Sequence, residues 1–218
     1  MVTRVQLKHA IRASCAILEQ PGVIVIGSQS ILATWPDTEL PVVATQSMEL
    51  DICPLADNDA QALAMVLGGA IGELSPFNEA FGFYIDGVGK NTATLPDDFS
   101  ERLIAVSDND TKGYVGFCID PHDLCVAKLV AGRDKDMIFV DALIGQRFVD
   151  PRIIGRFLVH TKMPHSTRKR IEQYLQPIIE LWDHHEVRAM QPRRSLGVPY
   201  SSVNHDAQTA LTAYLNEI

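Results

Sequence analysis

The segment Val23–Ile26 is a run of four β-branched residues between Pro21-Gly22 and Gly27. A short apolar run bounded by residues that favour turns predicts a buried β-strand that ends in a tight turn. The turn leads into a helix-like stretch from Ser28 to Trp35. Because glycine lets backbone N–H groups approach a ligand closely and a helix N-terminus favours anions, the turn at Gly27 and Ser28 suits a phosphate group.

A second segment, Ser47–Ile52, alternates polar and apolar residues. Residues two apart on a strand project from the same face, so Glu49 and Asp51 are expected to point together. The residues expected to pack inward are Met48, Leu50 and Ile52. Two carboxylates so close repel one another unless a cation lies between them, and Mg²⁺ prefers such oxygen ligands together with substrate phosphates. A Mg²⁺ site beside a phosphate site is the minimum equipment for phosphoryl or nucleotidyl transfer.

A third segment places a lysine within an apolar helix. Apolar residues around Lys128 recur at three- and four-residue spacing, which predicts a helix that ends near Gly132. A lysine there is costly unless its stem reaches solvent or its amine has an anionic partner. Asp134 or Asp136 would begin the next helix, which extends over 137–144.

Each of these motifs also has an ordinary explanation. A Gly-Ser pair after a strand is common, alternating acids often form a solvated face, and the stem of Lys128 could simply reach solvent. Asp86, at the end of a further predicted strand, is either a third carboxylate of the site or an acid beside the turn at Gly87. The order of the three motifs along the chain favours the functional interpretation.

The whole pattern predicts an α/β (α+β) fold with a mixed β-sheet flanked by helices, followed by a C-terminal helical region. The strands are expected at 23–26, 47–52, 81–86, 103–106 and 114–119. The helices are expected at 5–19, 57–74, 121–131 and 137–144. Three more helices are expected after Asp120: one starting at Asp150-Pro151, one over 168–188 preceded by Ser166 or Thr167 and bent at Pro177, and one over 206–217. Residues 191–202, with two prolines and a glycine, are expected to form a loop before the last helix. Residues 1–145 would form one domain, with 146–218 packed on it.

Charge is uneven along the chain. Residues 1–110 contain five Lys or Arg and 15 Asp or Glu, a net charge of −10, whereas residues 111–218 contain 14 and 12, a net charge of +2. A basic cluster in the second half could contact RNA phosphates or a nucleotide, or could be a solvated face. Its members are Lys162, Arg168, Lys169, Arg170, Arg188, Arg193 and Arg194.

The remaining composition points to an ordinary globular protein. No apolar run approaches the ~18 residues that cross a membrane, and the N-terminal segment lacks the pattern of a secretory signal, so we expect a cytoplasmic protein with no membrane partner. The four cysteines, Cys15, Cys53, Cys118 and Cys125, have no spacing suited to zinc and are expected in the core.

The segments Ile26–Leu32, Ser47–Ile52 and Lys128–Asp136 together resemble a family of bacterial nucleotidyltransferase-like proteins of unassigned function, related to the AbiEii toxins of abortive-infection toxin–antitoxin systems. The segments 71–77 and 87–96 resemble the same family. The resemblance covers roughly residues 22–145. It implies a nucleotidyltransferase-like fold that binds a nucleoside triphosphate (NTP) and Mg²⁺.

The resemblance also implies roles for particular residues. Gly27 and Ser28 would hold the triphosphate, and Glu49 with Asp51 would bind Mg²⁺. Lys128 would face the phosphates, accompanied by Arg133, and Asp136 would be a later catalytic acid. Either Asp136 or Asp86 would complete the metal site.

The expected activity is therefore Mg²⁺-dependent transfer of a nucleotidyl group from an NTP to an acceptor, either RNA or protein, by a toxin-type enzyme. One alternative is a catalytically degenerate protein that only binds nucleotide, because the first acid of the pair is glutamate and 20 residues separate Ser28 from Glu49. Another is an interaction module, one half of a toxin–antitoxin pair with an antitoxin partner.

Overall fold

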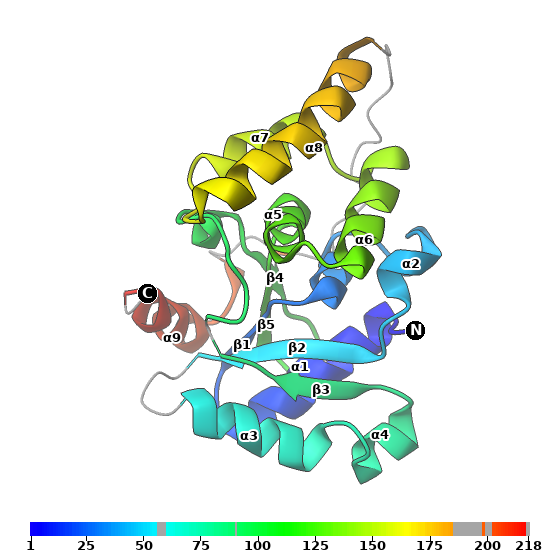
Figure 1. Cartoon of the computed structure of the whole chain (residues 1–218). Coiled ribbons are helices and arrows are strands. Elements are labelled where there is room, and N and C mark those ends of the chain that lie inside the picture. Colours follow the sequence, from blue (N-terminus) through cyan, green and yellow to red (C-terminus); the bar gives the residue numbers. More distant parts are fainter. Residues whose placement is uncertain (56–59, 90, 185–197, 199–201, 217–218) are drawn as a thin grey trace.

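A five-stranded mixed β-sheet forms the centre of the computed structural model, which describes residues 1–55, 60–89, 91–184, 198 and 202–216. The strands are β1 (Gly22–Val25), β2 (Glu49–Pro54), β3 (Tyr84–Gly87), β4 (Ile104–Val106) and β5 (Val115–Cys118), in the order β3-β2-β1-β5-β4. β1 is antiparallel to β2 and parallel to β5, whereas β2 is parallel to β3 and β4 is antiparallel to β5. The predicted α+β class with a mixed sheet is confirmed (Figure 1).

The β-branched run does form the central strand. All four residues of β1 are buried, as are all four of β5, because both strands have neighbours on either side and helices on both faces. The sequence Gly27-Ser28 then starts the 3₁₀ helix η1 (Ser28–Ala33), which matches the expected helix-like stretch after the turn. The chain therefore turns away from the sheet at the carboxyl end of β1.

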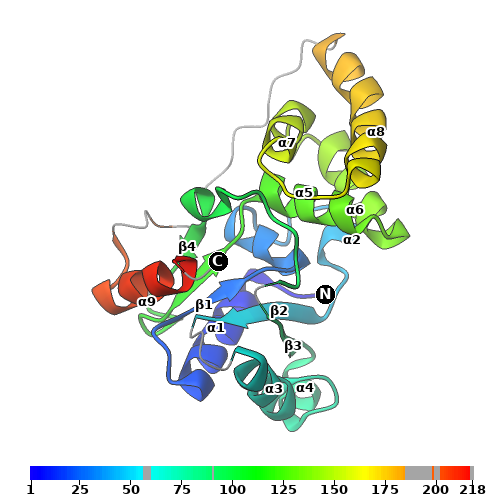
Figure 2. The ribbon, with the colours of Figure 1, turned by 60° about the vertical axis from the view of Figure 1, so that its left-hand side comes forward.

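Helices cover the two faces of the sheet. On one face lie α1 (Arg4–Leu18) and α3 (Ala60–Ile71), with α4 (Pro76–Phe81) beyond α3. Towards the other face lie η1, the short helix α2 (Val42–Thr45), α5 (Pro121–Ala131) and α6 (Asp134–Gly145). Figures 1 and 2 show α7 (Pro151–Leu158) and α8 (His165–His184) stacked on α5 and α6, farther from the sheet.

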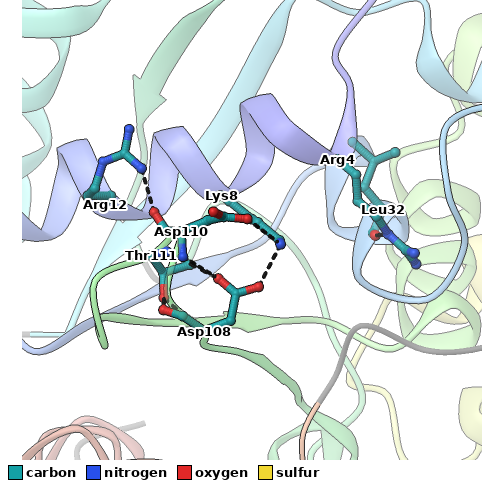
Figure 3. Close-up of polar contacts among 7 residues, drawn as sticks. All are labelled: Arg4, Lys8, Arg12, Leu32, Asp108, Asp110 and Thr111. Atoms are coloured by element: carbon teal, nitrogen blue, oxygen red, sulfur yellow. Dashed lines mark hydrogen bonds and ion pairs between the residues drawn. The ribbon is translucent and has the colours of Figure 1, made fainter.

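Helix α1 is attached to its surroundings by basic side chains. Lys8 Nζ lies 2.5 Å from Asp108 and 2.9 Å from Asp110 on the β4–β5 connection, and Arg12 donates a hydrogen bond to the Asp110 carbonyl (Figure 3). At the start of the helix, Arg4 Nε donates to the Leu32 carbonyl at 2.8 Å. Since Leu32 belongs to η1, the first turn of α1 directly supports the segment that follows Gly27.

The C-terminal part of the described chain is largely helical. Asp150 caps α7 with Pro151 in the first turn, and Pro177 lies inside α8, as predicted. α9 (His205–Leu215) contacts β1, and Tyr214 is buried there with its hydroxyl 3.6 Å from Cys53 Sγ. The proposed boundary at residue 145 stays a prediction.

Several expected boundaries were wrong. The strand expected at 81–86 begins only at Tyr84, because Ser75 caps a separate short helix, α4, that Phe81 ends. Met48 precedes β2 and is 51% exposed rather than packed inward, whereas Leu50 and Ile52 are buried.

The region after Asp120 departs from expectation at one helix start, since α8 begins at His165 rather than after Ser166 or Thr167. α6 begins at Asp134, one of the two expected positions. Val198, within the segment expected as a loop, forms a β-bridge with Ala105. The expected positions 57–59, 185–188, 191–197, 199–201 and 217 lie outside the described residues, as do Arg188, Arg193 and Arg194.

All four cysteines are buried and none forms a disulfide, which confirms their predicted place in the core. Of the helices within the described residues, none combines the length and the apolar character needed to cross a membrane.

Candidate active site

A cleft of about 760 Å³ opens at the carboxyl end of β1, between the sheet and the helices α2, α5 and α6. Its walls contain nearly every residue singled out from the sequence, contributed by five separate segments. These are Gly27, Ser28, Glu49, Asp51, Asp86, Lys128 and Arg133. Asp136 is fully buried behind this wall and reaches the cleft only through its partners.

Three carboxylates gather on adjacent strands. Glu49 and Asp51 are two residues apart on β2, and the parallel pairing of β2 with β3 places Asp86 directly beside Asp51. The three side chains each offer an oxygen within 4.8 Å of the others. Of the two candidates for a third acid, Asp86 rather than Asp136 lies in this cluster.

The electrostatics of the cluster are unfavourable without a cation. Burial, together with the charge of Glu49, raises the pKa of Asp51 to about 7, and the nearby Lys128 offsets this only in part. Burial and the charge of Glu49 also raise the pKa of Asp86. Both shifts show that negative charge is costly here, which is the condition that a bound cation relieves.

The donor set fits a small divalent cation. Mg²⁺ binds oxygens at 2.0–2.1 Å, so opposite ligands of one ion lie about 4.1 Å apart. Adjacent ligands of an octahedral ion lie about 2.9 Å apart. The three carboxylate oxygens lie within 4.8 Å of one another, so they would draw together around a bound ion. All three donors are hard oxygen ligands, the type that Mg²⁺ prefers.

Gly27 lies against the acidic cluster. A Cβ atom at this position would be 1.5 Å from Oδ2 and 2.5 Å from Cγ of Asp51. The backbone N–H of Ile26 also donates to the Asp51 carbonyl at 3.0 Å, which fixes β1 and β2 at this point. Only glycine allows the turn and the carboxylate to lie so close together.

The opposite wall of the cleft is basic. Lys128 Nζ lies 3.2 Å from Asp136 Oδ1 and 4.4 Å from the centre of the Phe139 ring, and Arg133 Nε donates to Asp136 Oδ2 at 2.6 Å. Asp136 thus holds two cations that come from either side of the α5–α6 turn.

The pKa values on this wall follow from the same contacts. Burial lowers the pKa of Lys128, and Asp136 acts against that shift. Although burial opposes it, hydrogen bonds from Arg133 and the charge of Lys128 hold the pKa of Asp136 below its ordinary value. Of the two explanations left open for Lys128, a stem to solvent or an anionic partner, the structure shows the partner, Asp136.

Sequence reasoning missed the apolar part of the cleft and one further cation. The apolar lining includes Val43, Ala44, Val88, Leu124, Ile138 and Phe139, and the polar lining includes Thr92, Thr94 and Lys135. Nothing in the sequence marks the apolar residues, since their spacing is that of any packed helix. Lys135 was signalled only by its place between Arg133 and Asp136.

A mixed sheet flanked by helices, with an acidic cluster beside a glycine turn and a basic wall across the cleft, defines an α+β fold of the nucleotidyltransferase-like class. The chain belongs to the family described as "Nucleotidyltransferase of unknown function (DUF6036)", which matches residues 5–175. The expected nucleotidyltransferase-like family is thereby confirmed. No curated protein and no solved structure matches the chain.

Proposed function

We propose that the protein is a Mg²⁺-dependent nucleotidyltransferase that moves a nucleotidyl group from an NTP to an acceptor. The observation that carries the proposal is the meeting, in one cleft, of the three carboxylates with the Gly27-Ser28 turn and the cation Lys128. The family description supports the reaction class. It leaves the nucleotide and the acceptor open.

Glu49, Asp51 and Asp86 would hold Mg²⁺ on the sheet side of the cleft. Held by these residues, Mg²⁺ would supply positive charge that stabilises the departing pyrophosphate. The raised pKa of Asp51 supports this assignment, because a carboxylate that resists ionisation alone gains most from a cation.

The residues around the turn and the basic wall would orient the triphosphate. At Gly27 and Ser28 the chain starts η1, and backbone N–H groups at such a start favour phosphate oxygens. Lys128 and Arg133 would supply positive charge from the other wall, with Asp136 as a positioning residue that holds both. The acceptor oxygen would then attack the α-phosphorus in line, and the bond to the departing pyrophosphate would break.

The acceptor would be RNA or protein. Relation to the AbiEii-type toxins and an antitoxin partner are part of the proposal and rest on the sequence resemblance. A cytoplasmic location is also proposed, from the hydropathy of the chain and its N-terminal segment. A catalytically degenerate protein that only binds nucleotide is the competing proposal.

The deciding experiment incubates the protein with each α-labelled NTP, Mg²⁺ and total cellular RNA or protein. Label that appears on an acceptor, and disappears in Asp51→Asn, supports the enzyme. Calorimetric binding of an NTP without pyrophosphate release against any acceptor would favour the degenerate alternative. If the protein bound neither nucleotide nor Mg²⁺, both would be rejected.

A further inference from the structure

One stretch of the chain carries positive charge alone. Residues 151–171 contain six Lys or Arg and no Asp or Glu, although the whole chain has a net charge of −8. The six are Arg152, Arg156, Lys162, Arg168, Lys169 and Arg170. They lie on α7, on the connection to α8 and on the first turns of α8.

Three of these six cations are engaged in holding the structure together. Arg152 forms an ion pair with Asp150, and Arg168 donates to the carbonyls of Leu158 and Thr161. Arg170 donates to the Leu129 carbonyl at 2.8 Å, at the end of α5. The guanidinium groups of these three residues are therefore engaged within the protein.

The other three are available to a ligand. Arg156 and Lys169 are exposed, and within the described chain no ion pair or hydrogen bond of their side chains is found. Lys162 is 88% exposed, and among the residues that the structure describes its one ion-pair partner is Asp97, itself 57% exposed. Exposed pairs of this kind contribute about 0–1 kcal/mol and exchange readily for a stronger anion.

These three cations lie at one end of the α7–α8 hairpin, where α7 ends and α8 begins. Arg156 is in the last turn of α7, Lys162 is in the connection and Lys169 is near the start of α8. Figure 2 shows α7 and α8 packed against one another and joined by a short connection at this end. We call Arg156, Lys162 and Lys169 the hairpin cations.

This end of the hairpin is attached to the wall of the cleft. Thr161 forms a β-bridge with Pro96, and the Asp97 N–H donates to the His160 carbonyl at 2.7 Å. Thr92 and Thr94, a few residues earlier on the same segment, line the cleft. A ligand bound by the hairpin cations would therefore begin beside the proposed reaction site.

We propose that the hairpin cations bind the sugar-phosphate backbone of a polynucleotide acceptor and direct its terminal hydroxyl into the cleft. The proposal rests on the proposed function and names its acceptor class. Exposed Lys and Arg side chains grouped on one part of the surface are the electrostatic footprint of a nucleic-acid surface, and the weak pair of Lys162 with Asp97 can exchange for a phosphate. Residues 1–110 carry a net charge of −10, so most of that half of the chain repels the same polyanion.

The test measures fluorescence anisotropy of the full chain with a labelled RNA hairpin, and with a DNA hairpin of the same sequence, over a series of salt concentrations. The variants are Arg156→Gln, Lys162→Gln, Lys169→Gln and their combination. Each phosphate contact contributes about 0.7–0.9 to the slope of log K against log salt. Each substitution should therefore weaken binding and reduce the slope by about one.

Lys112→Gln is the matched control. Lys112 is exposed on the β4–β5 connection, which lies before β5 and so at the end of the sheet opposite Gly27. This change of the same charge should leave affinity and slope as they are. Circular dichroism checks that the variants are folded. Stronger binding of RNA than of DNA would identify the acceptor as RNA, and the reverse as DNA.

The proposal is overturned if the combined variant binds the RNA and DNA probes with unchanged affinity and an unchanged slope of log K against log salt. It is also overturned if the labelled acceptor proves to be a protein while the combined variant transfers label at the original rate. Failure of the proposed function gives a different result: the unmodified chain then transfers no label and binds no Mg²⁺. In that case, loss of RNA or DNA binding in the combined variant would still support the hairpin cations as a nucleic-acid-binding surface.

Discussion

Asp51 and Asp86 are paired residues on the parallel strands β2 and β3, so the hydrogen-bond register of the sheet itself brings their carboxylates together. Residues paired in this way project from the same face of a sheet. Glu49, two residues before Asp51, projects from that face as well. The acidic cluster is therefore a property of the rigid centre of the fold rather than of a loop.

Replacing Asp51 by Asn should separate metal binding from folding. The substitution removes one of three mutually repelling charges, so the metal-free variant should unfold at a higher temperature than the original chain at pH 8. At a Mg²⁺ concentration of 100 times its Kd, the original chain should gain about 2.7 kcal/mol and the variant almost nothing. Thermal unfolding with and without Mg²⁺ measures both effects.

Asp37→Asn is a suitable control for that experiment, because Asp37 is an acid of α1's surroundings whose carboxylate accepts from the Arg4 N–H. Its variant should keep the full response to Mg²⁺. Equal stabilisation of the Asp51→Asn variant by Mg²⁺ would show that the ion binds elsewhere.

The pH dependence of stability should carry the signature of Asp51. Its pKa is raised from 3.8 to about 7 on folding, so between those values the folded state holds a proton that the unfolded chain releases. Without metal, this group should therefore reduce stability as pH rises from about 4 to about 7, by an amount on the order of a few kcal/mol. Unfolding in chelator at pH 5 and pH 8 measures the effect, and the difference between the original chain and Asp51→Asn isolates it.

Mg²⁺ affinity should change in the opposite direction. The ion competes with the proton on Asp51, so affinity should rise with pH up to about 7 and then level off. Calorimetric titration at several pH values measures this profile. A profile that is flat between pH 5 and pH 8 would contradict the assignment of Asp51 as a ligand.

Substituting Gly27 by Ala should disturb the same site from its other side. The added methyl group would overlap the Asp51 carboxylate, so β1 and β2 must shift at a cost of about 1–3 kcal/mol, and the carboxylates must move apart. Weaker Mg²⁺ binding and a lower Tm are expected together. Gly69→Ala in α3 is the control, since its Cβ would meet no atom within 4 Å and should raise helix stability slightly.

Asp136→Asn should reveal a positioning role. The Asp136 side chain is fully buried and Lys128 is 12% exposed, so removal of one charge leaves the other poorly compensated and costs about 3–5 kcal/mol. The pKa of Lys128, already lowered by burial, should fall further. As pH rises and Lys128 loses its proton, triphosphate affinity should therefore fall at a lower pH in the variant than in the original chain. Binding titrations at a series of pH values measure this difference.

A double variant separates this role from simple loss of stability. Lys128→Met with Asp136→Leu removes both charges, and apolar replacement of a buried pair is often neutral for stability. It should fold but bind triphosphate weakly. Asp134→Asn, an exposed acid in the same helical turn, should change neither property. Normal triphosphate binding by the double variant would rule out Lys128 as a ligand.

Another buried acid should affect stability without affecting the site. Asp123 has a fully buried side chain and accepts two hydrogen bonds from Arg102, at 2.8 and 2.9 Å. The guanidinium group of Arg102 also stacks on the ring of Phe157 in α7. Asp123→Ala should therefore lower the free energy of unfolding by about 3–5 kcal/mol. Mg²⁺ affinity of the folded variant, measured by calorimetry below its Tm, should stay unchanged.

Local patterns were enough to predict the centre of the fold. The β-branched run, the alternation in β2 and the proline-started helices α5 and α7 each reflect interactions between near neighbours in the chain. Sequence patterns failed where a helix cap or a partner far away in the chain determines the local structure. Ser75 caps α4 and delays β3, and Val198 is extended because Ala105 offers it an edge.

The same distinction applies to the site. Glu49 and Asp51 could be recognised together because strand periodicity alone places them on one face. Asp86 could not be assigned with equal clarity, since only the register between β2 and β3 brings it to Asp51. The burial of Asp136 and the two cations on it depend on the turn between α5 and α6, which no spacing rule defines.

Val2 is fully buried, and Arg4 supports Leu32 of the segment after Gly27. Trimming the polypeptide past these positions would therefore loosen a pocket wall more than twenty residues downstream. Shortened versions for crystallisation or assays should retain Val2 and Arg4. An inactive protein that lacks them would not test the role of Glu49, Asp51 and Asp86.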